Sequence, residues 1–178
     1  MKIIIVGGVA GGATAAARIR RNDETAEIVL VERGLYISFA NCGLPYHISG
    51  TIAEREQLLV TSETTFKDRY QVDVRSHTEA ISIDRKAKVV RLRDLSSGKE
   101  FDETYDKLLL SPGAAPIHPK LPGIASSRVF SLHNIPDLDR IMEHLGQHST
   151  RRAIVIGGGF IGIEVAENLH DRGVSTTL

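Results

Sequence analysis

"KIIIVGGVAGGATAAARIRRNDETAEIVLVE" (residues 2–32) has the pattern of two strands around one helix. Residues 2–6 form a β-branched run that ends at glycines, which is typical of a buried parallel strand. Small, helix-favouring residues follow over 7–21, and after a polar turn a second apolar run occupies 26–32. This order predicts a βαβ unit with a right-handed crossover, and hence an α/β fold built on a parallel sheet.

The end of the chain repeats this pattern. Residues 151–178 have the order of a strand, glycines, a helix and the start of another strand. A parallel sheet with one completed strand cannot bury its faces, so we expect this chain to be the N-terminal part of a longer protein. We predict one domain over residues 1–118, a connector and helix over 119–150, and the incomplete start of a second domain over 151–178.

The middle of the chain carries shorter elements. A helix is predicted over 61–70 with Thr61 or Ser62 as its cap, and another over 134–145 with Asn134 as its cap. Alternating apolar and polar residues over 72–94 predict an antiparallel β-meander, with 96–100 as the next turn. Residues 105–110 predict a further strand that runs into a Pro/Gly-rich loop.

The composition limits the function classes. Lys and Arg together number 22, as do Asp and Glu, so the net charge is zero and nothing favours nucleic acid or an anionic membrane as a partner. One cysteine in 178 residues cannot form an internal disulfide, which fits a reducing compartment. The opening apolar run is too short for a signal peptide or a membrane span. We therefore expect a cytoplasmic protein.

Both glycine loops follow a predicted strand and precede a predicted helix. Gly157, Gly159 and Gly162 fit the G-x-G-x-x-G pattern, in which the backbone approaches a pyrophosphate at a helix start. The first loop has Gly7 and Gly12 in the outer positions but Val9 in the middle one. Two Rossmann-like units indicate two different dinucleotides.

An acidic residue supports the first of these sites. Glu32 ends the second strand 20 residues after Gly12, where an acid can accept hydrogen bonds from an adenosine ribose. The corresponding acid of the second unit would lie just past Leu178, so the sequence leaves NADH and NADPH open. A solvated strand end is the alternative interpretation of Glu32.

Five stretches together resemble the flavin-dependent pyridine nucleotide–disulfide oxidoreductases: "IVGGVAGGATAAARIRR", "VERG", "SFANCGLPY", "YDKLLLSPGAAP" and "VIGGGFIGIEVAENL". Within that family they are most similar to the single-cysteine branch, which includes coenzyme A–disulfide reductases, persulfide reductases, and NADH oxidases and peroxidases. The segment 38–42 followed by Pro45 and Tyr46 is the most specific part. The resemblance covers the whole chain.

The resemblance implies two cofactors, FAD and either NADPH or NADH. The residues implied to bind FAD are Gly7, Gly8, Val9, Ala10, Gly11, Gly12, Glu32, Arg33, Ala80, Ser111, Pro112 and Gly113. Those implied to bind the nicotinamide nucleotide are Gly157, Gly159, Gly162 and Glu164.

The resemblance also implies that Cys42 is the catalytic redox thiol, which forms a mixed disulfide with a small thiol. Pro45 is tolerated in the first turn of a helix, so we expect a helix to begin near Asn41 or Cys42. The positive end of a helix favours the thiolate form of a cysteine. The alternative is a buried, inert cysteine.

A second set of residues is expected to bind the substrate. Thr14, Arg18 and Arg21 share one helix face by their i, i+4, i+7 spacing, and two arginines suit the phosphates of coenzyme A. An ordinary solvated helix face is the alternative. The resemblance adds Ser38 and Asn41 to this site.

Three positions bear on the choice of substrate. Ala10 stands where the family's oxidases and peroxidases have a histidine, which favours a disulfide over peroxide. Arg18 replaces a glutamine of some relatives. Tyr70 stands where some coenzyme A–disulfide reductases have a lysine, which leaves a persulfide open.

The expected function is flavin-dependent reduction of coenzyme A disulfide by NAD(P)H. The alternatives are an NADH-dependent persulfide or polysulfide reductase, an NADH oxidase, and a non-catalytic dinucleotide-binding fragment. The resemblance implies a homodimer for the full-length protein and little activity for these 178 residues alone. His144 and His148 lack a third ligand, so no metal site is predicted.

Overall fold

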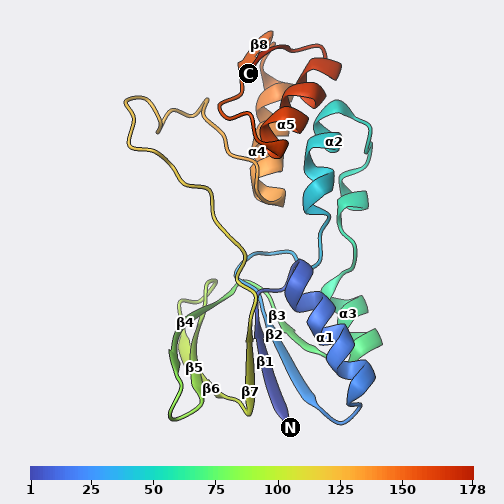
Figure 1. The fold of residues 1–178 in the computed structure, drawn as a ribbon, viewed down its shortest axis with the longest axis vertical. Coiled ribbons are helices and arrows are strands. Elements are labelled where there is room, and N and C mark those ends of the chain that lie inside the picture. The colour runs from blue at the N-terminus through green and yellow to red at the C-terminus, as the bar shows by residue number, and fades with distance from the viewer. The chain divides into compact units, whose positions relative to one another are not determined.

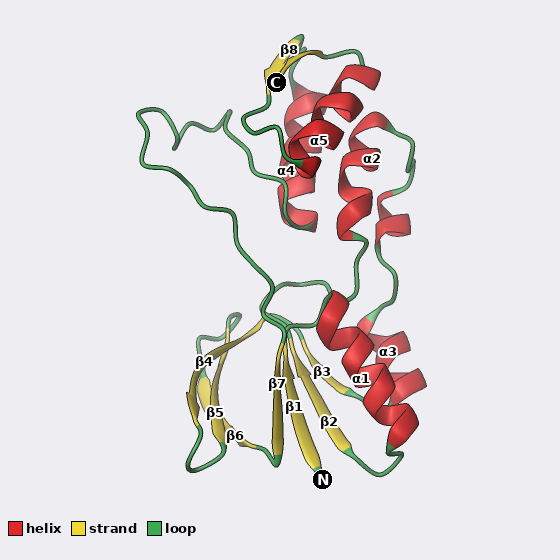
Figure 2. Cartoon of the chain, in the orientation of Figure 1, coloured by secondary structure: helices red, strands yellow, loops and turns green.

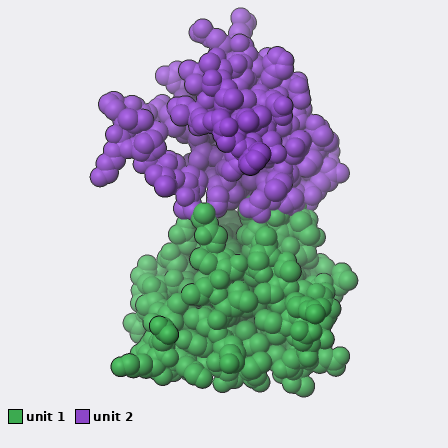
Figure 3. Space-filling view, in the orientation of Figure 1, with its two compact units in different colours: residues 1–39, 59–114 green, residues 40–58, 115–178 purple.

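The computed structural model describes all of residues 1–178 and divides them into two compact units (Figure 3). The first unit consists of residues 1–39 and 59–114. The second consists of residues 40–58 and 115–178, so it includes a short segment from early in the chain.

The first unit is built on a four-stranded parallel sheet (Figure 1). Its strand order is β3 (Asp73–Arg75), β2 (Glu27–Val31), β1 (Lys2–Val6) and β7 (Lys107–Leu110). In the centre of the sheet, Ile4 of β1 is in register with Val29 of β2 and Leu108 of β7. The βαβ unit predicted from residues 2–32 is present, with α1 (Ala10–Asn22) as its helix.

Both faces of this sheet are covered (Figure 2). Helices α1 and α3 (Glu63–Tyr70) cover one face, where Ile3 and Ile5 pack with Ala16 and Phe66. The other face meets an antiparallel sheet of β4 (Thr78–Asp84), β5 (Val89–Asp94) and β6 (Glu100–Thr104), and there Ile4 packs with Leu92. Successive side chains of a strand point to opposite faces, which is why one β-branched run serves two cores.

The predicted meander over residues 72–94 was wrong in its first part. Asp73–Arg75 joins the parallel sheet beside β2, and the antiparallel sheet begins only at Thr78. His77 has a positive φ of 49°, which breaks the extended run, and Val72 is fully buried in the core beneath α1 and α3. The remaining strands form the meander as predicted.

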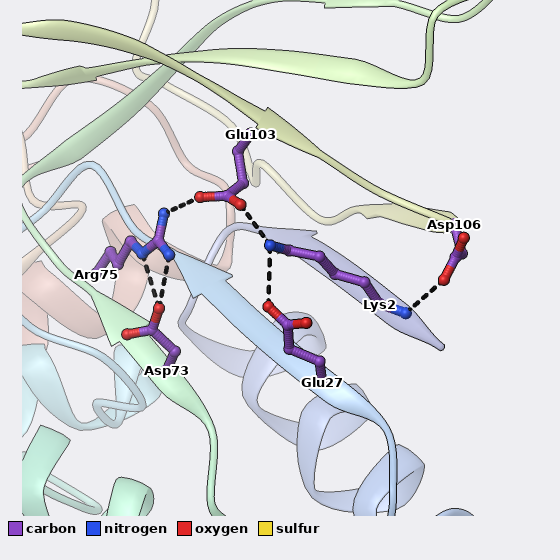
Figure 4. Close-up of polar contacts among 6 residues, drawn as sticks. All are labelled: Lys2, Glu27, Asp73, Arg75, Glu103 and Asp106. Carbon is purple, nitrogen blue, oxygen red and sulfur yellow. Dashed lines mark hydrogen bonds and ion pairs between the residues drawn. The ribbon is translucent and has the colours of Figure 1, made fainter.

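An ion-pair network joins the two sheets of the first unit (Figure 4). The carboxylate of Glu103 on β6 accepts hydrogen bonds from Lys2 Nζ and Arg75 Nη1, both on the parallel sheet. Lys2 Nζ also lies 2.9 Å from Glu27, and Arg75 Nη2 lies 2.7 Å from Asp73. The side chain of Glu103 is only 15% exposed, so this carboxylate is the central acceptor of the network.

The network makes the stability of this unit depend on pH. Burial by itself would raise the pKa of Glu103, but the hydrogen bonds from Lys2 and Arg75 outweigh it and hold the pKa below the usual 4.5. A carboxyl whose folded-state pKa is lowered stabilises the fold above its unfolded-state pKa. That contribution is lost as the pH falls through the folded-state pKa.

The second unit contains helices α2 (Leu44–Ser49), α4 (Ile135–Gln147) and α5 (Phe160–Asp171) and the short parallel pair β8 (Arg152–Ile154) and β9 (Ser175–Thr177). The strand–helix–strand order predicted for residues 151–178 is confirmed. Two 3₁₀ turns, η1 (Asn41–Gly43) and η2 (Arg55–Leu58), flank α2. Helix α2 packs against α4 and α5.

The predicted helix starts at 61–62 and 134 are confirmed. Ser62, rather than Thr61, caps α3 and accepts a hydrogen bond from Thr65 N at 3.0 Å. Asn134 caps α4 and accepts one from Asp137 N at 2.8 Å. A polar side chain that satisfies the free N–H groups of a first turn is a local signal, which is why sequence alone located these starts.

Candidate functional site

The two glycine loops have the same backbone geometry. The first glycine of each loop has a positive φ, 99° at Gly7 and 115° at Gly157. A Cβ on Gly12 would lie 1.7 Å from the carbonyl oxygen of Gly7, and a Cβ on Gly162 would lie 1.9 Å from that of Gly157. Glycine is therefore required at the first and last positions of both loops.

The helices that follow these loops begin without a side-chain cap. Neither α1 nor α5 has a capping hydrogen bond or an acidic residue in its first turn. Helices α3 and α4 have both. An uncapped helix start leaves N–H donors and positive partial charge for an anion, so both loops fit the pyrophosphate of a dinucleotide.

Glu32 holds the first loop to the end of β2. Its Oε2 accepts a hydrogen bond from Gly8 N at 2.6 Å, and its Oε1 accepts one from Gly34 N at 2.7 Å. A carboxylate offers about four lone-pair positions, so these two bonds leave acceptor capacity for a ribose hydroxyl. The structure thus gives Glu32 a role in shaping the loop besides the predicted one in binding ribose.

The turn at Ser111 lies against the first loop. A Cβ on Gly7 would be 1.9 Å from Ser111 O, and one on Gly11 would be 2.3 Å from Ser111 Oγ. Pro112 and Gly113 continue this turn, with φ of 70° at Gly113. The structure therefore brings the predicted residues of the first loop together with Glu32 and Ser111.

The other two predicted residues of this site lie in the bend after β2, for Arg33, and on β4, for Ala80. Arg33 is exposed, and its Nη1 lies 3.6 Å from Glu79 on β4. Ala80 is the next residue of β4, at the start of an irregularity in its pairing with β5. The ion pair thus connects Arg33 to the strand that carries Ala80.

Cys42 is exposed and lies in η1, directly before α2. The helix start expected near Asn41 or Cys42 is a 3₁₀ turn, and the α-helix itself begins two residues after Cys42, at Leu44, with Pro45 in its first turn. Ala40 N donates to Leu58 O at 2.8 Å, and a Cβ on Gly43 would lie 2.9 Å from Leu58 Cδ2. The turn with Cys42 is therefore packed tightly on η2, and the alternative of a buried cysteine was wrong.

The three arginines of helix α1 differ in whether their side chains form hydrogen bonds. Arg20 is engaged, since its guanidinium donates to the carbonyl oxygens of Tyr70, Gln71, Asp23 and Glu24. Thr14, Arg18 and Arg21 are exposed, and the side chains of Arg18 and Arg21 form no hydrogen bond or ion pair. These two guanidinium groups are therefore available to an anionic ligand.

The predicted substrate residues are divided between the units. Thr14, Arg18, Arg21 and Ser38 belong to the first unit. Ser38 N donates to Gly8 O of the first loop at 3.1 Å. Asn41 and Cys42 belong to the second unit, as do Glu164 and the second glycine loop.

A cavity in the second unit and a stacked histidine pair do not involve any of the predicted site residues. A cavity of about 400 Å³ in the second unit contains none of them and is lined by Ile124, Ala125, Ser126, Ser127, Val129, Phe130 and Arg140. The rings of His144 and His148 stack with centroids 4.5 Å apart, and no group of three or more metal-binding side chains occurs. None of the helices is long and apolar enough to cross a membrane.

Sequence reasoning missed the contacts that hold the cysteine segment. Arg172 Nη1 at the end of α5 donates to Ile48 O of α2 at 2.8 Å. Arg55 of η2 donates from Nε and Nη2 to the carboxylate of Asp139 on α4, at 2.6 and 2.8 Å. No motif marks these residues, and the one available signal is an arginine directly before Gly173 at a helix end.

Comparisons with known proteins agree with this geometry. The family model described as pyridine nucleotide-disulphide oxidoreductase matches residues 1–178. The coenzyme A disulfide reductase of Staphylococcus haemolyticus (strain JCSC1435) is 42% identical over 177 residues, which are 99% of this chain and 40% of that protein. The chain thus spans about 40% of the length of the curated relatives that it matches.

Two solved structures are similar over almost the whole chain. Reduced Bacillus anthracis CoADR-RHD has a TM-score of 0.97 at 49% identity, covering 99% of this chain and 32% of that one. The NAD-dependent persulfide reductase from A. fulgidus has a TM-score of 0.94 at 38% identity, with the same two coverages. With matching motifs, loop geometry and overall structure, this chain belongs to the pyridine nucleotide-disulphide oxidoreductase family.

Proposed function

We propose that the intact protein uses NAD(P)H to reduce coenzyme A disulfide, through FAD and the thiol of Cys42. The observation that carries this proposal is the exposed position of Cys42 in η1, directly before α2, in a chain similar to coenzyme A disulfide reductases. We propose that the partner of Cys42 is the sulfur of a small thiol, as the similarity to coenzyme A disulfide reductases suggests.

The proposed reaction is a thiol–disulfide exchange followed by a two-electron reduction. The Cys42 thiolate attacks one sulfur of the disulfide, forms a mixed disulfide and releases the other half as a thiolate. Two electrons and the protons needed then cleave the mixed disulfide, which releases the second thiol and restores Cys42. In total, one disulfide, one NAD(P)H and one proton give two thiols and the oxidised nucleotide.

The residues that would hold the cofactors are those of the two loops. We propose that the start of α1, with Glu32, Arg33, Ala80 and residues 111–113, binds FAD. A bound flavin supplies a two-electron carrier between a nicotinamide and a disulfide. The start of α5 with Glu164 would bind the nicotinamide nucleotide. The uncapped helix starts support both assignments because they offer free N–H groups to phosphate.

For the substrate, we propose that Thr14, Arg18, Arg21, Ser38 and Asn41 bind the coenzyme A part. The support is the unpaired state of the two exposed guanidinium groups. We also propose domain boundaries near residues 118 and 150, a homodimer and a cytoplasmic location for the intact protein.

A persulfide substrate is the second candidate, favoured by the similarity to a protein named as a persulfide reductase. An NADH oxidase is less well supported. Ala10, the first residue of α1, has only a methyl side chain and offers no proton donor for oxygen chemistry. A non-catalytic nucleotide-binding protein would not require an exposed Cys42.

The test is anaerobic reduction of coenzyme A disulfide by NADH and by NADPH, with the intact protein and its Cys42→Ser variant. We expect turnover in the wild type and a loss of at least 1,000-fold in the variant, of the order seen when a catalytic nucleophile is removed. Reduction of a persulfide but not of the disulfide would favour the second candidate. Full activity of Cys42→Ser would refute the redox role of this residue.

A further inference from the structure

Helix α2, which follows the turn with Cys42, is too short to be stable without contacts to the rest of the protein. It spans six residues, Leu44–Ser49, and isolated helices of this length do not persist in water. Its last carbonyl groups have no partner within the helix. Gly50 N donates a hydrogen bond to the carbonyl oxygen of His47 at 3.2 Å, and the guanidinium of Arg172 donates one to that of Ile48 at 2.8 Å. The end of α2 therefore depends on a residue 124 positions away in the chain.

Arg172 is itself held firmly at the end of α5. Gly173 has a φ of 88°, and its N–H donates to His170 O at 2.8 Å, while Val174 N donates to Leu169 O at 3.0 Å. This pair of bonds is the Schellman ending of a helix, and Leu169 and Val174 are both buried, as is common in that motif. The backbone of Arg172 is thus fixed relative to α5, the helix that starts at the second glycine loop.

The contact between Arg172 and the end of α2 is also electrostatically favourable. The carbonyl end of a helix carries negative partial charge, which a guanidinium stabilises, and a hydrogen bond from a charged donor is stronger than one between neutral groups. The packing of Gly43 against Leu58 fixes the other end of the segment, and the bidentate pair of Arg55 with Asp139 holds η2 to α4. Cys42 directly precedes Gly43 and lies six residues before Ile48.

We propose that Arg172 is a positioning residue that aligns the Cys42 turn with the nucleotide-binding helix α5. This inference rests on the proposed redox role of Cys42 and deepens it. Arg172 contacts the end of α2 and not the proposed nucleotide loop, so its loss disturbs the thiol and leaves nucleotide binding intact. A displacement of about 1 Å at a reacting group can lower a rate 100-fold.

The test uses the intact protein with Arg172→Met, which keeps an apolar stem but removes the donor, and Arg172→Lys, which keeps a cationic donor. Arg151→Met is the matched control, because Arg151 is also exposed in the second unit and its side chain has no hydrogen bond or ion pair. Two quantities are measured. The first is the rate at which Cys42 reacts with 4,4′-dithiodipyridine, with Cys42 identified by mass spectrometry. The second is the change in kcat compared with the change in the KM for NADH or NADPH.

We expect Arg172→Met to lower kcat and the Cys42 reaction rate by roughly tenfold or more, with the nucleotide KM within about twofold of wild type. Arg172→Lys should recover most of the loss, and Arg151→Met should match wild type. A merely structural role would lower the melting temperature without this split. If Arg172→Met does not fold, Arg172→Leu, which also lacks a donor, provides the same comparison.

Wild-type rates in Arg172→Met, or an equal loss in Arg172→Lys, would overturn the inference. A change confined to the nucleotide KM would overturn it too, because it would place Arg172 in nucleotide binding. The proposed function fails separately, through absent turnover of the disulfide in the wild type. The reaction rate of Cys42 with the probe still tests the positioning role in that case.

Discussion

Replacement of Gly12 by alanine tests the geometry of the first loop directly. Gly12 lies in the first turn of α1, and its Cβ would be 1.7 Å from the carbonyl oxygen of Gly7. Real Cβ atoms essentially never come closer than 3.0 Å, so the two atoms must separate by about 1.3 Å. The obstacle is backbone, which cannot rotate away as the end of a flexible side chain can.

The magnitude follows from two opposing effects. Forcing an extra methyl group into a packed site costs about 1–3 kcal/mol, and a clash of this size with the backbone places the cost of Gly12→Ala at about 3 kcal/mol. Alanine is favoured over glycine inside a helix by about 1 kcal/mol. The clash therefore wins, and we expect a net loss of about 2 kcal/mol in the free energy of unfolding, together with weaker retention of FAD.

Gly146→Ala is the matched control. Gly146 lies in α4, with nothing within 4 Å of an added Cβ, so only the helix preference acts and we expect a gain of up to about 1 kcal/mol. Urea unfolding followed by circular dichroism gives both free energies, and flavin absorbance after gel filtration gives the bound FAD. A Gly12→Ala variant as stable as wild type, with full FAD content, would refute the reasoning.

Two further predictions concern charges in the first unit. Glu103→Gln should cost about 1–2 kcal/mol at pH 7, because it weakens two hydrogen bonds from cations. Its difference from wild type should shrink as the pH falls from 4.5 through the lowered folded-state pKa, where the wild-type carboxyl becomes protonated. Urea unfolding at pH 7 and pH 3 measures this, and a difference that grows in acid would contradict it. Arg18→Met combined with Arg21→Met should raise the KM for coenzyme A disulfide about tenfold, equivalent to about 1.4 kcal/mol, through lost phosphate contacts. Steady-state kinetics with cystine, which lacks phosphates, is the control, and an equal effect on both substrates would speak against phosphate binding.

The features that sequence alone located are set by neighbours in the chain. The β-branched run of residues 2–6 and the glycines after it specify a strand and a tight turn within ten residues. Ser62 and Asn134 were recognisable as caps because each bonds an N–H group only three residues away. The glycine spacing of both loops is likewise local, since Gly12 approaches Gly7 and Gly162 approaches Gly157.

Contacts between distant residues decided the rest. Asp73–Arg75 has the alternation of a meander strand, yet the burial of Val72 beside α1 and α3 draws it into the parallel sheet. The sequence does not distinguish Arg20 from Arg18 and Arg21. Only the folded structure places the carbonyl oxygens at the end of α3 where the guanidinium of Arg20 donates hydrogen bonds to them. The cysteine segment belongs to the second unit because α2 packs against α4 and α5, where Arg172, 124 residues after Ile48, completes the hydrogen bonds of α2. Short stretches of sequence determine the local backbone preferences. The packing of the whole chain determines which group binds a free carbonyl oxygen or guanidinium.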